Sequence, residues 1–143
     1  MLRHMRTRQS GFSLVEMLVA TLVLSLGLLG IAGMQTLSLR NNNNAYLRTQ
    51  ANLLAYDIVD SMRANRDAAL NDDYDVTING SIPTTDPVAQ ADLTIWLANL
   101  ATVLPEGDGA VDCDVNNVCE ITVQWTEVSN AAVTTDIRLS TEI

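Results

Sequence analysis

The sequence predicts an α+β fold in which a long, hydrophobic N-terminal helix packs on a small antiparallel β-sheet. Three patterns lead to this prediction. An uncharged apolar run extends from Met17 to Met34, and apolar residues then recur at helical spacing as far as Met62. The last segments of the chain alternate apolar and polar residues, which is typical of strands with one buried face.

The apolar run is a candidate membrane span. Met17 to Met34 has eighteen residues and would extend roughly 27 Å as a helix, close to the hydrocarbon core of about 30 Å. Arg3, Arg6 and Arg8 precede it, whereas its far end is rich in asparagine. This asymmetry predicts a cytoplasmic N-terminus, with everything past about Gln35 outside the inner membrane, which in a Gram-negative cell means the periplasm.

Three glycines interrupt the span, at Gly27, Gly30 and Gly33. Each weakens the interior of a helix by roughly 1 kcal/mol relative to alanine. Membrane helices tolerate glycine, but glycine also allows close helix–helix contact or local melting in a filament. Both interpretations stay open at this point.

We expect the helix to continue beyond the span, which covers residues 12–35, as an amphipathic segment over 36–70. Its apolar stripe has helical spacing and consists of Leu47, Ala51, Leu54, Ile58 and Met62. The helix could kink or break at Asn41–Asn44, because asparagine is a mediocre helix former. The stripe is expected to dock on a globular head, residues 71–143.

A second helix is expected in the head over 86–104. Asp86 suits the N-cap and Pro87 the first helical position, while Pro105 ends the pattern. Its apolar positions follow the i, i+3, i+4, i+7 spacing and are Leu93, Trp96, Leu97, Leu100 and Leu104. This stripe predicts core packing against the sheet.

Strands are expected at four places in the head. The segments 119–126 and 136–143 alternate apolar with polar residues, as in a half-solvated antiparallel sheet. Val111–Asp114 predicts a third strand that turns into 119–126. Tyr74–Ile78 is a short fourth candidate.

The composition argues against catalysis and nucleic-acid binding. The net charge is −9, and removal of a leader with three arginines leaves five basic against seventeen acidic residues, or −12, a surface that repels nucleic acid. The single histidine, His4, lies in this leader, and lysine and phosphate-binding glycine motifs are absent from the sequence. Aspartate pairs at 72–73 and 112/114 lie in expected loops, where a solvated carboxylate is the simpler interpretation. We therefore expect a non-enzyme without a cofactor.

Cys113 and Cys119 are predicted to form a disulfide. Their spacing fits neither a Cys-x-x-Cys redox motif nor a zinc site with other ligands, and the periplasm is oxidising. Closing a ring of about seven residues stabilises by roughly 2 kcal/mol in the chain-entropy model.

Oxygen-bearing side chains surround the same hairpin, at Asp108, Asp112, Asp114 and Asn116. Calcium prefers such ligands, but the spacing fails the EF-hand pattern. Simple loop acidity is the favoured interpretation, and no metal ligand is assigned.

Glu16 is the acidic residue at the edge of the span, where a buried carboxylate is expensive and therefore suggests function. An ordinary signal anchor with Glu16 at the headgroup boundary is the alternative. However, the segment Arg8-Gln9-Ser10-Gly11-Phe12-Ser13-Leu14-Val15-Glu16 resembles the class III signal of type IV pilins and type II secretion pseudopilins. The resemblance implies that a membrane peptidase removes residues 1–11 by cutting between Gly11 and Phe12, and methylates Phe12. It also implies that Glu16 recruits the N-terminus of a neighbouring subunit and sets the register of assembly.

Residues 22–35 are similar to the PilV-type minor pilins, also called type IV pilus modification proteins. This resemblance implies a minor pilin that takes part in pilus assembly or initiation, incorporated into the pilus or its tip complex. Its partners would be the major pilin, other minor pilins and the prepilin peptidase. A minor pseudopilin of type II secretion and a pilus-displayed adhesin or ligand-binding head are the alternatives.

Overall fold

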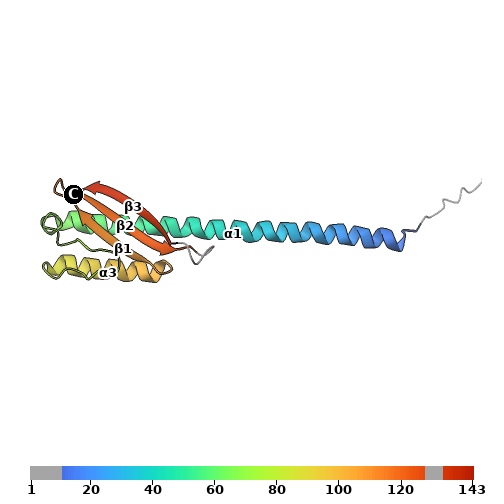
Figure 1. The fold of residues 1–143 in the computed structure, drawn as a ribbon, viewed down its shortest axis with the longest axis horizontal. Coiled ribbons are helices and arrows are strands. Elements are labelled where there is room, and N and C mark those ends of the chain that lie inside the picture. Colours follow the sequence, from blue (N-terminus) through green and yellow to red (C-terminus); the bar gives the residue numbers. More distant parts are fainter. Residues whose placement is uncertain (1–10, 128–133) are drawn as a thin grey trace, which may run out of the picture. The chain divides into compact units, whose positions relative to one another are not determined.

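The computed structural model describes residues 11–127 and 134–143. The chain divides into two compact units, Met1–Leu39 and Arg40–Ile143. The elements in chain order are the helices α1 (Leu14–Ala64), α2 (Arg66–Ala69) and α3 (Pro87–Val103), and the strands β1 (Asp108–Cys113), β2 (Val118–Thr126) and β3 (Thr134–Glu142). The predicted α+β class is confirmed: a long N-terminal apolar helix and a small antiparallel sheet (Figure 1).

The second half of α1 forms the centre of the head. α1 stays helical through Asn41–Asn44, so the helix does not break at the asparagine run. Its apolar stripe is buried, as expected, and includes Leu47, Ala51, Leu54, Ala55, Ile58, Val59 and Met62. Burial of this stripe against the rest of the head supplies the packing energy that a long helix needs to be stable in water.

α1 ends at Ala64, earlier than the predicted continuation to residue 70. Asn65 leaves the helical conformation at φ −117° and ψ 53°. Its side-chain amide donates to Asp86 Oδ1 at 3.0 Å and to the Tyr74 hydroxyl at 3.5 Å. Because an asparagine side chain competes with regular helical structure when it finds other partners, the chain turns here and continues as the single turn α2.

The sheet is a three-stranded antiparallel meander in the order β1-β2-β3. In its register Val111 lies opposite Ile121, and Ile121 opposite Leu139. In β2 the side chains of Cys119, Ile121, Val123 and Trp125 are buried, whereas Val118 and the polar residues that alternate with them are not. The sheet thus turns one face to the core, which confirms the alternation expected for half-solvated strands.

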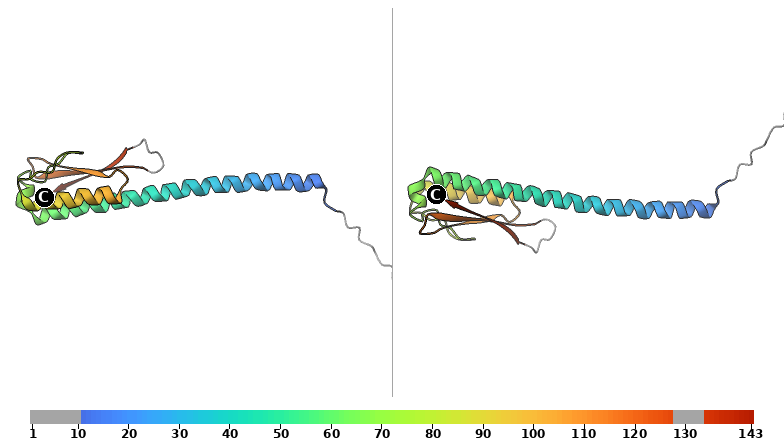
Figure 2. Two further views of the ribbon diagram at one scale, coloured as in Figure 1. Left: turned by 90° about the horizontal axis from the view of Figure 1, so that it is seen from below. Right: turned by 90° about the horizontal axis from the view of Figure 1, so that it is seen from above.

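The helices α1 and α3 form one layer of the head and the sheet forms the other (Figure 2). Asp86 caps α3 by accepting the backbone N–H groups of Val88 and Ala89 at 3.0 and 2.8 Å. Gly109 of β1 lets α3 approach the sheet closely, because a Cβ at this position would collide with the ring of Trp96.

The predicted strand at Tyr74–Ile78 is wrong except at one residue. Val76 forms an isolated antiparallel bridge with Val111, with both N···O distances 2.9 Å. The chain then turns, since Gly80 N donates to Thr77 O and Asn79 has a φ of 55°. A left-handed residue so soon after the bridge prevents a longer ladder.

Candidate functional site

The proposed cleavage bond lies in an exposed, non-helical part of the first unit. Gly11, Phe12 and Ser13 precede α1, and the Phe12 side chain is 79% exposed. No atom lies within 4 Å of a Cβ built on Gly11. The Gly11–Phe12 peptide bond is therefore open to a protease, whose active site must bind its substrate in an extended form. Residues 1–10, which include the arginines of the leader and His4, lie outside the described residues.

Ser13 and Glu16 together have the pattern of a helix capping box. Ser13 Oγ accepts the backbone N–H of Val15 at 3.3 Å, and Ser13 O accepts that of Met17 at 3.2 Å. Glu16 is therefore the third residue of α1, where a negative charge interacts favourably with the helix dipole. This second role of Glu16 was not among the roles predicted from the sequence, although the Ser-x-x-Glu spacing indicates it.

The Glu16 carboxylate is exposed. Among the described residues it has no hydrogen-bond or ion-pair partner. As far as the described residues go, the Glu16 carboxylate is thus available to a positively charged group of another molecule.

Every residue from Gly11 to Asn43 is exposed. Sixteen of those before Arg40 are large hydrophobics: Phe12, Leu14, Val15, Met17, Leu18, Val19, Leu22, Val23, Leu24, Leu26, Leu28, Leu29, Ile31, Met34, Leu37 and Leu39. By length and composition α1 qualifies as a membrane-spanning helix. A surface of this kind requires lipid or other helices to cover it.

Three hydroxyl groups in this apolar segment are satisfied by the helix itself. Thr21 Oγ1 donates to Met17 O at 3.0 Å, Ser25 Oγ to Leu22 O at 2.8 Å, and Thr36 Oγ1 to the preceding turn. None of these hydroxyls requires water or a second helix as a partner. The part of α1 from Met17 to Thr36 can therefore enter an apolar environment without leaving these three hydroxyls unpaired.

Cys113 and Cys119 form a disulfide at the β1–β2 hairpin, in the second unit. The two residues are also register partners in the sheet. The turn is held by Asp114, whose Oδ1 accepts the N–H groups of Asn116 and Val118 at 2.8 and 2.9 Å. The Asn116 side-chain amide and these N–H groups hold the pKa of Asp114 below its usual value. The disulfide thus closes the β1–β2 hairpin.

Two of the other acidic candidates, Asp108 and Asp73, have structural partners. Asp108 Oδ2 accepts the N–H of Asn79 at 2.7 Å, and Asp73 accepts the Thr85 hydroxyl. Within residues 11–127 and 134–143, no group of three or more His, Cys, Asp or Glu side chains is placed to hold a metal ion. In this hairpin Asp114 and Asp108 therefore accept backbone N–H groups of nearby turns.

The half-buried carboxylate of Asp75 and the buried side chain of Tyr74 join the loop after α2 to the rest of the head. Asp75 Oδ1 accepts the N–H of Cys113 at 3.1 Å, and burial raises the pKa of Asp75 to about 6. The Tyr74 hydroxyl donates to Asp92 Oδ2 at 2.6 Å. Burial, together with this bond to Asp92, raises the pKa of Tyr74, so its phenol remains a neutral donor.

Comparison with known proteins identifies one feature. Residues 6–32 match the prokaryotic N-terminal methylation motif. No curated protein and no solved structure gives a significant match to the chain. The motif covers the exposed Gly11–Phe12 bond, Glu16 and most of the apolar surface of the first unit. Together with the long apolar helix and the small antiparallel sheet, the motif supports the interpretation that the chain is a type IV pilin-like protein. Such a protein has a structural role.

Proposed function

We propose that the chain is a minor pilin of the PilV type that takes part in type IV pilus assembly or its initiation. The prepilin peptidase cuts after Gly11 and methylates Phe12. Before assembly the protein spans the inner membrane once, with its head in the periplasm. It then enters the pilus or its tip complex beside the major pilin and other minor pilins. The observation that supports this most strongly is that the methylation motif, residues 6–32, coincides with an apolar helix whose side chains are exposed.

The energetics of the first unit favour assembly as its role. Fully burying one large apolar side chain stabilises by about 1.5–3 kcal/mol, so covering sixteen of them is worth tens of kcal/mol. A lipid bilayer covers this surface before assembly, and neighbouring helices cover it in a filament. The difference between these two environments is small, because lipid is as apolar as the helices. Polar contacts must therefore decide which neighbour is chosen.

Glu16 supplies such a contact. Removal of the leader creates a positive α-amino group on Phe12. A carboxylate in an apolar environment costs several kcal/mol unless it is paired or protonated. In a filament, Glu16 of one subunit accepts the N-terminus of the next, and this pair sets the axial register of the helices.

The two roles of Glu16 can be separated by substitution. Glutamine serves at the third position of a capping box as glutamate does, but it carries no charge. We therefore expect Glu16→Gln and Glu16→Ala to be cleaved normally and both to be lost from sheared pili, whereas Ser13→Ala, which removes the N-cap hydroxyl, is incorporated. Immunoblots of sheared pili and of membranes measure this. Normal incorporation of Glu16→Gln would show that the charge of Glu16 has no role in assembly.

A further inference from the structure

One carboxylate at the end of a strand holds a turn of α1. Glu127 follows directly after β2, and its Oε2 accepts the side-chain amide of Asn44 at 3.1 Å. Its Oε1 accepts Arg48 Nη2 at 2.9 Å. Asn44 and Arg48 are four residues apart and therefore lie on the same face of the helix. These three side chains, which we call the Glu127 clamp, thus join one turn of α1 to the end of β2.

The strand end that carries Glu127 is itself fixed to the head. The Thr126 N–H donates to Pro105 O at 2.9 Å, and the Thr126 hydroxyl donates to Glu106 Oε2 at 2.7 Å. The Glu127 side chain is only 15% exposed, whereas that of Arg48 is 58% exposed. Because these contacts fix the end of β2, Glu127 is a rigid anchor for the helix.

The clamp lies where the burial of α1 begins. The described residues before Asn44 are all exposed, and Leu47 is the first buried one among the described residues. Asn41–Asn43 directly precedes the clamp, and asparagine is a poor helix former. Helical segments without tertiary packing are marginal in water, and local unfolding costs least where few side chains are buried. Within the second unit, Asn41–Asn43 is therefore the part of α1 that opens most easily.

We propose that the Glu127 clamp stops this opening, so that Asn41–Asn43 unfolds locally while the head keeps its structure. When Asn41–Asn43 leaves the helical conformation, Asn44 becomes the N-cap of the remaining helix, a position at which asparagine is preferred. The carbonyl of Asn44 still accepts the N–H of Arg48 in that helix. The clamp therefore lets the preceding residues change conformation without unfolding the turn that contains Leu47. This inference does not depend on the proposed pilus role.

Hydrogen exchange of the full chain in detergent micelles tests this, with mass spectrometry and electron-transfer fragmentation to separate neighbouring amides. In the parent we expect the amides of residues 42–47 to exchange at least about tenfold faster than those of 48–62. Glu127→Ala removes the clamp, so the amides of 48–51 should then exchange at least about fivefold faster. The control is Glu120→Ala, which also removes an arginine-paired glutamate from the sheet and should leave these amides unchanged.

Arg48→Gln tests the same contact from the helix, at a side chain exposed enough that its replacement does not unfold the core. It should accelerate the amides of 48–51, and adding it to Glu127→Ala should change little more, because both substitutions break one interaction. The inference is wrong if 42–47 exchange as slowly as 48–62 in the parent, or if neither variant accelerates 48–51. It is also wrong if the two effects add fully, or if both variants accelerate β2 and α3 to the same extent.

Discussion

The indole N–H of Trp96 donates a hydrogen bond of 2.9 Å to the main-chain oxygen of Leu54. The bond is buried and joins α3 to the central helix across 42 positions of sequence. Gly109 lies against the same ring from the side of the sheet. Trp96 therefore connects both layers of the head, and its side chain fixes where α3 lies on α1.

Trp96→Phe should destabilise the head by more than Trp125→Phe does. Both changes remove the same atoms from a buried site, but Trp125 Nε1 has no acceptor among the described residues. Losing a made hydrogen bond costs about 1 kcal/mol, whereas removing a buried unpaired donor relieves a cost. We expect a difference of about 1–3 kcal/mol in unfolding free energy. Denaturant titration of the full chain in detergent, followed by circular dichroism, measures it. If both variants lost the same unfolding free energy, the hydrogen bond from Trp96 to Leu54 would not contribute to stability.

Gly109→Ala should also destabilise the head, because its methyl group meets the rigid Trp96 ring and Leu100 Cδ1. Overpacking of a well-packed core typically costs about 1–3 kcal/mol. Gly27→Ala is the control, since nothing lies within 4 Å of a Cβ there. Thermal unfolding of the three proteins in one detergent compares them. A Gly109→Ala protein as stable as the parent would mean that α3 can move away from β1.

The raised pKa of Asp75 predicts a pH-dependent contribution to stability. Burial raises the pKa of Asp75 in the folded protein to about 6, above its ordinary value of 3.8, so the folded state binds the proton more tightly. The contribution of Asp75 to stability therefore increases as the pH falls from 7 towards 5. Asp75→Asn should raise the unfolding temperature by a few degrees at pH 7.5 and by less at pH 5.

The matched control for Asp75 is Asp67→Asn, which removes one charge from an exposed position. Each variant is compared with the parent at the same pH, so that other titrating groups cancel. The prediction would be contradicted if Asp75→Asn lowered the unfolding temperature at pH 7.5, or raised it equally at both pH values. Either result would mean that the buried charge of Asp75 does not destabilise the folded head.

The disulfide should stabilise the hairpin by roughly 2 kcal/mol, as expected for a ring of this size. Replacing Cys113 and Cys119 by alanine should lower the unfolding temperature by several degrees. Adding reductant to the parent should bring its unfolding temperature towards that of the variant, and it should leave the variant unchanged. Insensitivity of the parent to a reductant that demonstrably opens the bond would exclude a stabilising role.

Periodic patterns made much of the head predictable from sequence. The stripe from Leu47 to Met62 is buried, α3 begins beside its Asp86 cap, and β2 buries alternate residues. Each of these elements has a local signal, helical spacing, a cap or strict alternation, that agrees with its place in the fold.

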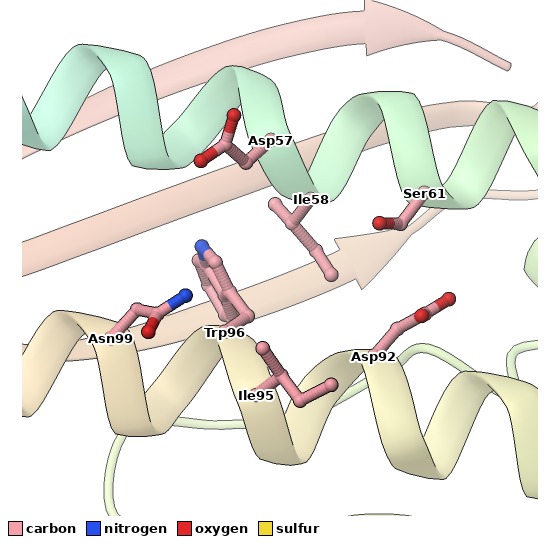
Figure 3. A pocket seen from close by; sticks show the side chains of 7 residues that line it. All are labelled: Asp57, Ile58, Ser61, Asp92, Ile95, Trp96 and Asn99. Atoms are coloured by element: carbon pink, nitrogen blue, oxygen red, sulfur yellow. The ribbon is translucent and has the colours of Figure 1, made fainter.

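Features that depend on tertiary partners could not be predicted in the same way. Asn65 ends α1 because Asp86 and Tyr74 happen to accept its amide. Val76 forms only one bridge because the chain turns at Asn79. Asp57 of α1 and Asp92 of α3 line the same small pocket (Figure 3) only because the two helices pack side by side, and nothing in their local sequence indicates this.

The N-terminus of the mature protein tests the central claim most directly. The full chain is purified from cells that make the prepilin peptidase, and its N-terminal peptide is analysed by mass spectrometry. We predict a chain that begins at Phe12 and carries one methyl group on its α-amino nitrogen. A chain that keeps residues 1–11, or that begins within the apolar segment after Glu16, would contradict the account.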